Sequence, residues 1–323
     1  MPSLKEIKGR IASVNSTRKI TSAMKMVASS KLHHAQVAIQ NMLPYEELLE
    51  HILKSFLAAE AEAQTIYDQE RPVKRAALVV FSSNSSLCGG FNANTIKLMS
   101  HVVDEYSETI GRDKVEVYPI GRKVYEKARK MGLQVQGEYS ALADHPNVQQ
   151  CIEIAMELGR KFAQGQIDKV ELIYHHFKSA GSQVLTRKTF LPIDIEEELK
   201  ADHERDLTSV IATKESQEYL KKRGERDREE KKDDVKPLND NFIVEPDMNT
   251  VLSQLMPKLA HLMLYTALLD SNASEHAARM VAMQTATDNA DELLRQLNLQ
   301  YNKSRQQAIT SELLDIVGGS VNN

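Results

Sequence analysis

The sequence predicts a long antiparallel coiled coil of N- and C-terminal helices, combined with an α/β domain that has a mainly parallel sheet. Three observations predict this fold class. Two long stretches lack glycine, apolar residues in both recur about every 3.5 residues, and the region between them alternates short apolar runs with helical segments. Charged residues make up 27% of the 323 residues and aromatic residues only 5%. This composition favours exposed helices over one thick core.

The glycine-free stretches extend from Arg10 to Cys88 and from Glu225 to Val317. Glycine costs roughly 1 kcal/mol in a helix interior, so its absence over such lengths indicates helices. Their apolar seams consist of Leu4, Ile7, Ile11, Val14, Thr21, Ala28, Leu32, Ala35, Ile39 and Met42, and of Met280, Met283, Thr287, Ala290, Leu294, Leu297, Tyr301, Ser304 and Ala308. Each seam needs a partner, and the simplest partner is the other helix.

Two pairs of residues interrupt this pattern. Arg18 and Lys25 occupy seam positions, where charge weakens helix pairing, and this raises the hypothesis that they face another partner. Pro44 and Pro257 are candidate positions for a bend or a break in the helices.

The middle region begins with an apolar run at 76–81 followed by a polar turn, which predicts a buried strand. Further strands are expected at 115–120, 133–135 and 170–176, helices at 92–107, 122–131 and 148–162, and a hairpin turn at 179–182 that leads into a strand at 183–190. We therefore predict an N-terminal coiled-coil helix (1–60), an α/β, Rossmann-like domain (73–195), a charged insertion (196–241) and a C-terminal coiled-coil helix (246–318). Strands alternating with helices imply the mainly parallel sheet.

The sequence contains no phosphate-binding loop, zinc-protease motif or nucleophile elbow, so no catalytic, cofactor-binding or metal-binding residue is predicted. The segment 87–91 (LCGGF) is interpreted as a tight turn that opens a helix; an anion cradle or a reactive thiol at Cys88 are the alternatives. His33-His34 and His175-His176 lack the carboxylates or cysteines of a metal site and are interpreted as structural residues.

Charge and hydropathy limit the partners. The net charge of −4 implies no global attraction to nucleic acid or membranes, although the first 40 residues hold seven basic residues and one acidic residue. No segment approaches the roughly 18 consecutive apolar residues of a membrane-spanning helix, and no secretory signal is recognised at the N-terminus.

Five segments of the chain form recognisable motifs: 20–31 (ITSAMKMVASSK), 87–90, 274–283 (SEHAARMVAM), 286–290 and 301–315. They resemble segments of the gamma subunit of F-type ATP synthases. Residues 20–31 are similar to its N-terminal helix, 274–283 and 286–290 to its C-terminal helix, 301–315 to the family signature and 87–90 to its central domain. The resemblance covers nearly the whole chain in the expected order.

The chain departs from the family pattern at three places. These are Gly318-Gly319, where Gly-Ala is usual, 84–86, where many relatives carry an Asp-Arg-Gly-like turn, and the insertion, which is longer than in many bacterial relatives. That insertion lacks the paired cysteines of the chloroplast regulatory insert, so no thiol switch is predicted.

The resemblance implies a non-catalytic subunit without cofactors. It would be the central-stalk rotor, which turns inside a ring of three alpha and three beta subunits, transmits torque between the c ring and the catalytic beta subunits, and regulates ATPase activity and proton flow. Its partners would be the alpha, beta and epsilon subunits and the c ring, with no nucleic acid. Its place would be peripheral, on the cytoplasmic side of the bacterial inner membrane.

Residue roles carry over only where the motifs match. The positions expected to contact a beta subunit are Met24, Arg279, Arg305, Gln306 and Thr310, and those expected to contact the c ring are Phe242 and Glu245. Two other functions are open on the residues alone. One is a cytosolic coiled-coil adaptor with an α/β head, and the other is an enzyme that uses the 73–195 domain.

Overall fold

The computed structural model describes residues 3–58, 66–194, 205, 245 and 247–321, with side chains for all of these except 54–58, 248, 249 and 315–321. The chain divides into two units. The terminal unit comprises Met1–Ser29 and Arg279–Asn323, and the central unit comprises Ser30–Ala278.

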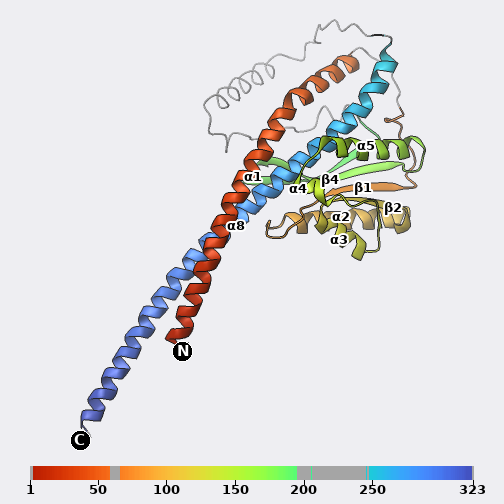
Figure 1. Cartoon of the computed structure of the whole chain (residues 1–323). Helices are drawn as coiled ribbons and strands as arrows, with labels where there is room; N and C mark the ends of the chain where they lie inside the picture. The colour runs from red at the N-terminus through yellow and green to blue at the C-terminus, as the bar shows by residue number, and fades with distance from the viewer. Residues whose placement is uncertain (1–2, 59–65, 195–204, 206–244, 246, 322–323) are drawn as a thin grey trace. The chain divides into compact units, whose positions relative to one another are not determined.

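Two long helices contribute to both units (Figure 1). Helix α1 spans Leu4–Ala58 and helix α8 spans Met248–Val321. The Ser3 hydroxyl caps α1 by accepting a hydrogen bond from the backbone N–H of Glu6 at 3.2 Å, and the Asp247 carboxylate caps α8. Pro44 and Pro257 lie inside the helices, so the interpretation of either proline as a break is wrong.

The helix pairing in the terminal unit follows the predicted seam. The outermost seam residues, from Leu4 to Val14 on α1 and from Leu294 to Ala308 on α8, are buried or half-buried. Most residues of these two segments that are not seam residues are exposed. The Thr21 and Thr287 hydroxyl oxygens lie 2.8 Å apart, and Arg18 Nη1 lies 3.0 Å from Asp291 Oδ1. Because the later residue of α1 meets the earlier residue of α8, the helices are antiparallel, as predicted.

The two basic residues at seam positions of α1, Arg18 and Lys25, differ in their contacts. Arg18 forms its ion pair with Asp291 of the partner helix, so the hypothesis that it faces another partner is wrong. Both side chains are more than a third exposed, and such a pair contributes only about 0–1 kcal/mol. Lys25 is half-buried, and within the described part of the chain no ion pair of Lys25 is found.

The central unit contains a five-stranded sheet in the order β3-β2-β1-β4-β5. Its strands are β1 (Ala76–Phe81), β2 (Val115–Ile120), β3 (Gln134–Val135), β4 (Lys169–Ser179) and β5 (Ser182–Leu191). Strands β1 to β4 pair in parallel, and β5 runs antiparallel to β4 through the predicted hairpin. The mainly parallel sheet is therefore confirmed.

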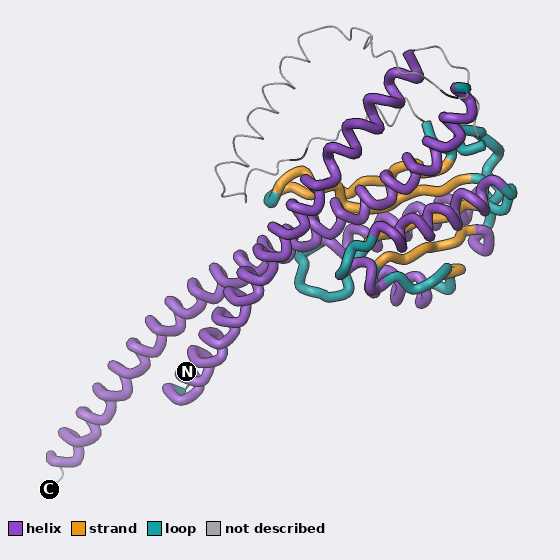
Figure 2. Tube along the Cα trace, turned by 45° about the horizontal axis from the view of Figure 1, so that its top comes forward, coloured by secondary structure: helices purple, strands orange, loops and turns teal. Residues whose placement is uncertain are grey.

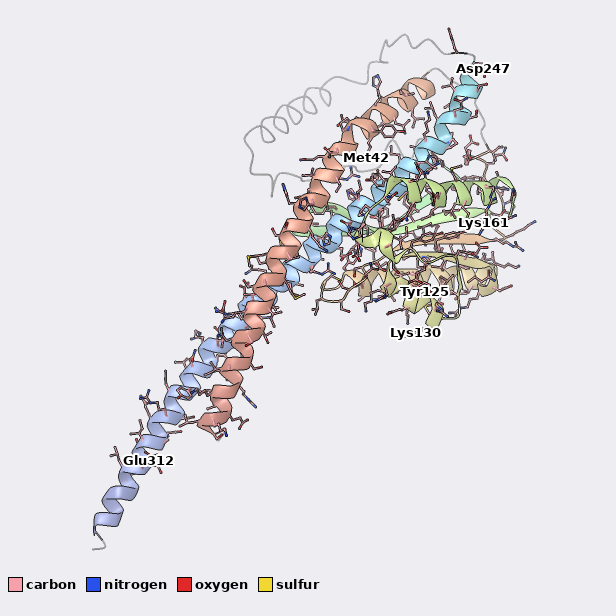
Figure 3. The ribbon with its side chains drawn as sticks, viewed as in Figure 1. Met42, Tyr125, Lys130, Lys161, Asp247 and Glu312 are labelled. Carbon is pink, nitrogen blue, oxygen red and sulfur yellow. The ribbon has the colours of Figure 1, made fainter. Side chains whose placement is uncertain are left out.

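Helices cover both faces of this sheet (Figure 2). On one face, Leu78 and Val80 of β1 pack with residues of α2 (Phe91–Thr109) and α3 (Arg122–Lys130). On the other, Val79 and Phe81 pack with α5 (Val148–Ala163) and with the parts of α1 and α8 in this unit. Accordingly, Tyr125 on α3 and Lys161 on α5 lie on opposite sides of the sheet (Figure 3). All six residues of β1 are buried because both faces are covered.

One stretch of α8 is buried although most of its side chains are polar. Asp270, Ser271, Asn272, Ser274, Glu275 and His276 are each at most 8% exposed. The Asn272 amide donates to the carbonyl of Ala143 in the short helix α4 (Ser140–Asp144) at 2.8 Å, and the Ser274 hydroxyl donates to the carbonyl of His175 at 3.1 Å. These hydrogen bonds fix α8 against β4 and α4, since each buried polar group needs a partner of defined geometry.

Candidate subunit interface

The terminal unit carries large apolar side chains that its own helix pairing does not cover. On α1, Ile20, Met26 and Val27 are 60%, 66% and 58% exposed. Ile20 and Val27 are seven residues apart and so lie on one side of the helix, with the exposed Ala23 between them. An apolar stripe outside the seam is typical of a surface that meets another protein.

Basic side chains accompany this stripe. Lys5, Lys8, Arg10 and Lys19 of the terminal unit are exposed. Of these, Arg10 pairs with Glu6 in the preceding turn at 3.4 Å. A partner surface that combines acidic and apolar groups would complement this region.

The residues predicted to contact a beta subunit form two groups in the terminal unit. Met24 and Arg279 are half-buried, and Arg279 has an interaction partner within the chain. Arg305, Gln306 and Thr310 are exposed. The helix rise of 1.5 Å per residue separates Arg279 from Arg305 by roughly 40 Å along α8, so the two groups would meet different parts of a partner.

Beyond the second group, α8 extends past the N-terminal end of α1 (Figure 1). Side chains around Glu312 project there from a single helix (Figure 3). Ile309, Leu313 and Leu314 are 46%, 57% and 65% exposed, and the first two lie one turn apart on the same side. The Thr310 hydroxyl donates to the carbonyl of Gln306 at 2.9 Å. An apolar side on an unpaired helix indicates that another chain covers it.

The residues predicted to contact the c ring are only partly described. Glu245 is exposed and precedes α8. Phe242 lies outside the described residues, as does the 196–241 insertion apart from Arg205.

The edge of the sheet where an α/β enzyme would bind its ligand is occupied by structural contacts. In doubly wound sheets this place lies at the carboxyl ends of the strands, where the strand order reverses, here beside β1. The loop after β1 caps α3 instead. The Ser82 hydroxyl accepts from the N–H of Val124 at 3.1 Å, and the Asn84 side-chain oxygen accepts from the N–H of Arg122 at 2.9 Å. Asn84, in the turn that departs from the family pattern, also donates to Ser140 and Asp144 at 2.7 Å each.

A neutral histidine fills the neighbouring position on β4, two residues beyond Ile173, the last β4 residue that pairs with β1. The His175 ring stacks on Phe91, the first residue of α2, with 4.3 Å between ring centroids. Burial lowers the pKa of His175 to about 4, so the ring is uncharged near neutral pH. Its Nδ1 lies 3.4 Å from the Thr95 hydroxyl. An uncharged, stacked ring does not complement an anion, and the arrangement therefore gives no support to an anion cradle at the 87–91 turn.

The backbone conformation of the 87–91 turn requires glycine at one of its two glycine positions. Gly89 has φ +59°, a conformation that residues with a side chain rarely adopt, whereas Gly90 has φ −81°. Cys88 is only 2% exposed, with Asn92 Nδ2 3.1 Å from its sulfur. Such burial contradicts the alternative of a reactive thiol. The second cysteine, Cys151, is fully buried, and burial raises the pKa of its thiol to about 12.

We therefore expect neither cysteine of the folded chain to react with a disulfide reagent at mildly alkaline pH. Thiolate is the reactive form, and Cys151 holds almost none of it, while Cys88 is covered. Release of the chromophore from Ellman's reagent measures the reaction, and the unfolded chain in denaturant should react at both positions. Fast modification of Cys88 in the folded chain would restore the reactive-thiol alternative.

Two further properties concern the described residues only. Groups of three or more His, Cys, Asp or Glu side chains that could hold a metal ion are absent there, and of the paired histidines His34 is exposed and His33 half-buried. None of the described helices has a stretch long and apolar enough to cross a bilayer.

Comparison with known proteins identifies relatives along the whole chain. The model of a family described as ATP synthase matches residues 3–321. A protein of Phocaeicola vulgatus named ATP synthase gamma chain is 51% identical over 321 residues, which cover 99% of this chain and 100% of the relative. A protein of Parabacteroides distasonis with the same name is 41% identical, with 99% of both chains covered.

Solved structures share the fold. A chain in the rotor of the Euglena gracilis mitochondrial ATP synthase superposes with a TM-score of 0.56 at 17% identity, covering 95% of this chain and 98% of that one. A chain in the central stalk and c ring of the Tetrahymena thermophila enzyme gives a TM-score of 0.50 at 22% identity, with 83% and 99% covered. The identity to named relatives, their full coverage and the match of the family model lead to one conclusion: this chain belongs to the ATP synthase gamma-chain family.

Proposed function

We propose that this chain is the central-stalk rotor of the F1 sector of a proton-translocating ATP synthase. As a gamma chain it is a non-catalytic subunit, and it transmits torque between the c ring and the catalytic beta subunits. The observation that carries this proposal is the antiparallel helix pair with apolar side chains on its outer side and a single exposed helix at its end. Its membership in the family supports the same function.

The continuity of the helices suits the transmission of torque. Both α1 and α8 pass from one unit into the other without interruption, because the unit boundaries at 29/30 and 278/279 fall inside them. A continuous helix carries a twisting force through its backbone and its i→i−4 hydrogen bonds. The central unit would receive the force from the membrane side, and the terminal unit would deliver it to the catalytic subunits.

The contact residues divide into a lower and an upper group. We assign Met24 and Arg279 to contacts with an acidic loop of a beta subunit, and Arg305, Gln306 and Thr310 to a second contact higher in the alpha and beta ring. As the rotor turns, each beta subunit meets a different side of the helices. Contacts that differ between nucleotide states shift the population of those states, which couples rotation to ATP synthesis or hydrolysis and allows regulation of both.

The remaining partners are assigned to the central unit. We place Glu245 and Phe242 at the polar loops of the c ring, and the epsilon subunit beside them. The complex would lie on the bacterial inner membrane, with this subunit peripheral on the cytoplasmic side and the insertion at 196–241 near the foot or the epsilon subunit.

Native purification tests the proposal. A chain with an affinity tag, expressed in its own organism and solubilised with its membranes, should bring down alpha and beta subunits in equal amounts together with ATPase activity. A cytosolic adaptor would instead appear without ATPase activity, and an enzyme of the 73–195 type would bind a substrate without these subunits. Recovery of the chain without alpha and beta subunits would overturn the proposal.

Met24→Lys is expected to uncouple the complex more than it disturbs assembly. A lysine at this half-buried position would add an ion pair with the acidic loop and hold one rotational state too tightly. Proton pumping per ATP hydrolysed, followed by fluorescence quenching in membrane vesicles, should fall several-fold while subunit content stays normal. Met24→Leu, which preserves size and adds no charge, is the control. Normal pumping by the lysine variant would contradict the role of Met24.

A further inference from the structure

A buried arginine joins two helices of the central unit. Arg205, whose side chain is 3% exposed, is the one residue of the 196–241 insertion that the structure describes. Its Nε and Nη2 donate to the two carboxylate oxygens of Asp270 on α8 at 2.9 and 3.2 Å. Its Nη1 donates to Glu46 Oε2 on α1 at 3.1 Å. One guanidinium therefore bridges helices that run side by side in this unit (Figures 1 and 2).

The acceptor carboxylates depend on this arginine. The Asp270 side chain is 1% exposed and that of Glu46 is 13% exposed. Among the described residues, the other recorded partner of Asp270 is His176 of β4, whose Nδ1 lies 2.6 Å from Oδ2. A carboxylate buried to this degree is stable only if it is paired, so loss of the guanidinium would leave excess negative charge inside the unit.

The surroundings strengthen the pairing. A cavity of about 260 Å³ lies beside Arg205, and its lining combines apolar side chains, among them Leu49 and Leu53, with charged ones, among them Glu50, Lys178 and Lys188. Ion pairs are stronger next to apolar groups than in water. Burial by itself would lower the pKa of Arg205, but the charges of Asp270 and Glu46 raise it overall, so the guanidinium is charged at any physiological pH.

We propose that Arg205 is a clamp that fixes the axial register of α1 against α8 and anchors the insertion to the helix pair at this level. Apolar contacts between helices are non-directional and allow small shifts along the axis. A guanidinium that meets one carboxylate with two parallel hydrogen bonds, and a second carboxylate with a third, has a fixed geometry. The clamp concerns contacts within this chain, so it stands whether or not the chain acts as a rotor.

Thermal unfolding of the full chain tests the clamp. Arg205→Gln is expected to lower the Tm by on the order of 10 °C, because it removes three charge-assisted hydrogen bonds and the positive charge that two largely buried carboxylates share. Arg205→Lys should restore only part of the loss, since an ammonium group cannot form the paired hydrogen bonds. Arg295→Gln is the matched control. Arg295 also makes two hydrogen bonds to one carboxylate, Glu292, but its side chain is 65% exposed, so its loss should change the Tm little.

A double-mutant cycle separates the clamp from general damage. If Arg205 and Glu46 act together, Glu46→Gln should destabilise the wild-type chain more than it destabilises the Arg205→Gln variant. Additive effects of the two substitutions, or an unchanged Tm in Arg205→Gln, would overturn the clamp. The cycle can be run in the Arg205→Lys background if the glutamine variant does not fold.

Limited proteolysis tests the anchoring of the insertion. A glutamate-specific protease is suitable because replacing an arginine neither adds nor removes one of its cleavage sites. Glu204, which directly precedes Arg205, provides a cleavage site next to the clamp. Cleavage after Glu204, relative to cleavage within the α/β region, should be slow in the wild-type chain and in Arg295→Gln and should rise at least several-fold in Arg205→Gln. Equal relative rates in all three proteins would overturn the anchor.

Discussion

Replacing Gly121 with alanine is expected to destabilise the central unit strongly. Gly121 precedes α3 with φ +109° and ψ 146°, a region of backbone conformation that is open essentially to glycine alone. A Cβ at this position would lie 2.1 Å from the carbonyl oxygen of Ser82 and 2.7 Å from its hydroxyl. The backbone of Ser82 cannot withdraw, because its N–H donates to Ile120 at 2.7 Å and its hydroxyl caps α3.

The cost should exceed that of an ordinary core substitution. Conformational strain and backbone overlap act together, so we expect a loss of about 4 kcal/mol or more in the free energy of unfolding. Urea denaturation followed by circular dichroism measures it, and an insoluble product is the extreme outcome. Gly132→Ala is the matched control. Gly132 also has a positive φ, +69°, but a Cβ there has no atom within 4 Å, and the loss should be about 1–2 kcal/mol. Similar stability of both variants would contradict this explanation.

Acidification is expected to destabilise the central unit through His175. Burial lowers the pKa of this side chain from 6.5 to about 4, so between these values the unfolded chain binds a proton that the folded chain does not. The stability that the uncharged His175 contributes is therefore fully present above pH 6.5 and is lost as the pH falls towards 4. The contribution of His175 should decrease by about 2 kcal/mol at about pH 5 and by about 3 kcal/mol near its folded pKa.

A variant that cannot be protonated isolates this effect. His175→Phe retains a ring against Phe91 but has no titrating group, so the decline of its stability over this pH interval should be smaller by the amounts given above. The comparison concerns the slope with pH, and a change in stability at neutral pH does not affect it. His145→Gln, at an exposed position, should preserve the wild-type slope. An unchanged slope in His175→Phe would show that the ring does not titrate as its burial requires.

The sequence predicted those parts of the fold that depend on local pattern. The seams of α1 and α8 are predictable because a coiled-coil face repeats every few residues, and β1 is predictable because a strand covered on both faces is apolar throughout. Helix α4 was missed because five residues are too few to show a period. Pro44 is a candidate break by its residue type, but α1 continues through it, and Leu43 and Leu49 beside it are buried.

Contacts between distant residues could not be predicted in this way. The pairing of Arg18 with Asp291 depends on the register of two helices separated by 273 positions in the chain. The bridge from Arg205 to Asp270 depends on how the insertion meets α8. One signal was present: Asp270 directly follows the stretch 262–269, which is apolar apart from Thr266, and a charge at the edge of such a stretch needs a buried partner. The sequence did not indicate which residue provides it.

The distance in sequence between the two seams also affects biosynthesis. Thr21 and the Thr287 that it meets are separated by 266 residues. At roughly 5–20 residues per second, the ribosome needs about 13–50 s to make the second after the first. During that time the N-terminal helix has left the exit tunnel with its apolar seam uncovered. Cells that make this protein must therefore shield nascent chains from one another, and a chaperone that binds short apolar helices would be most important before the last quarter of the chain has been translated.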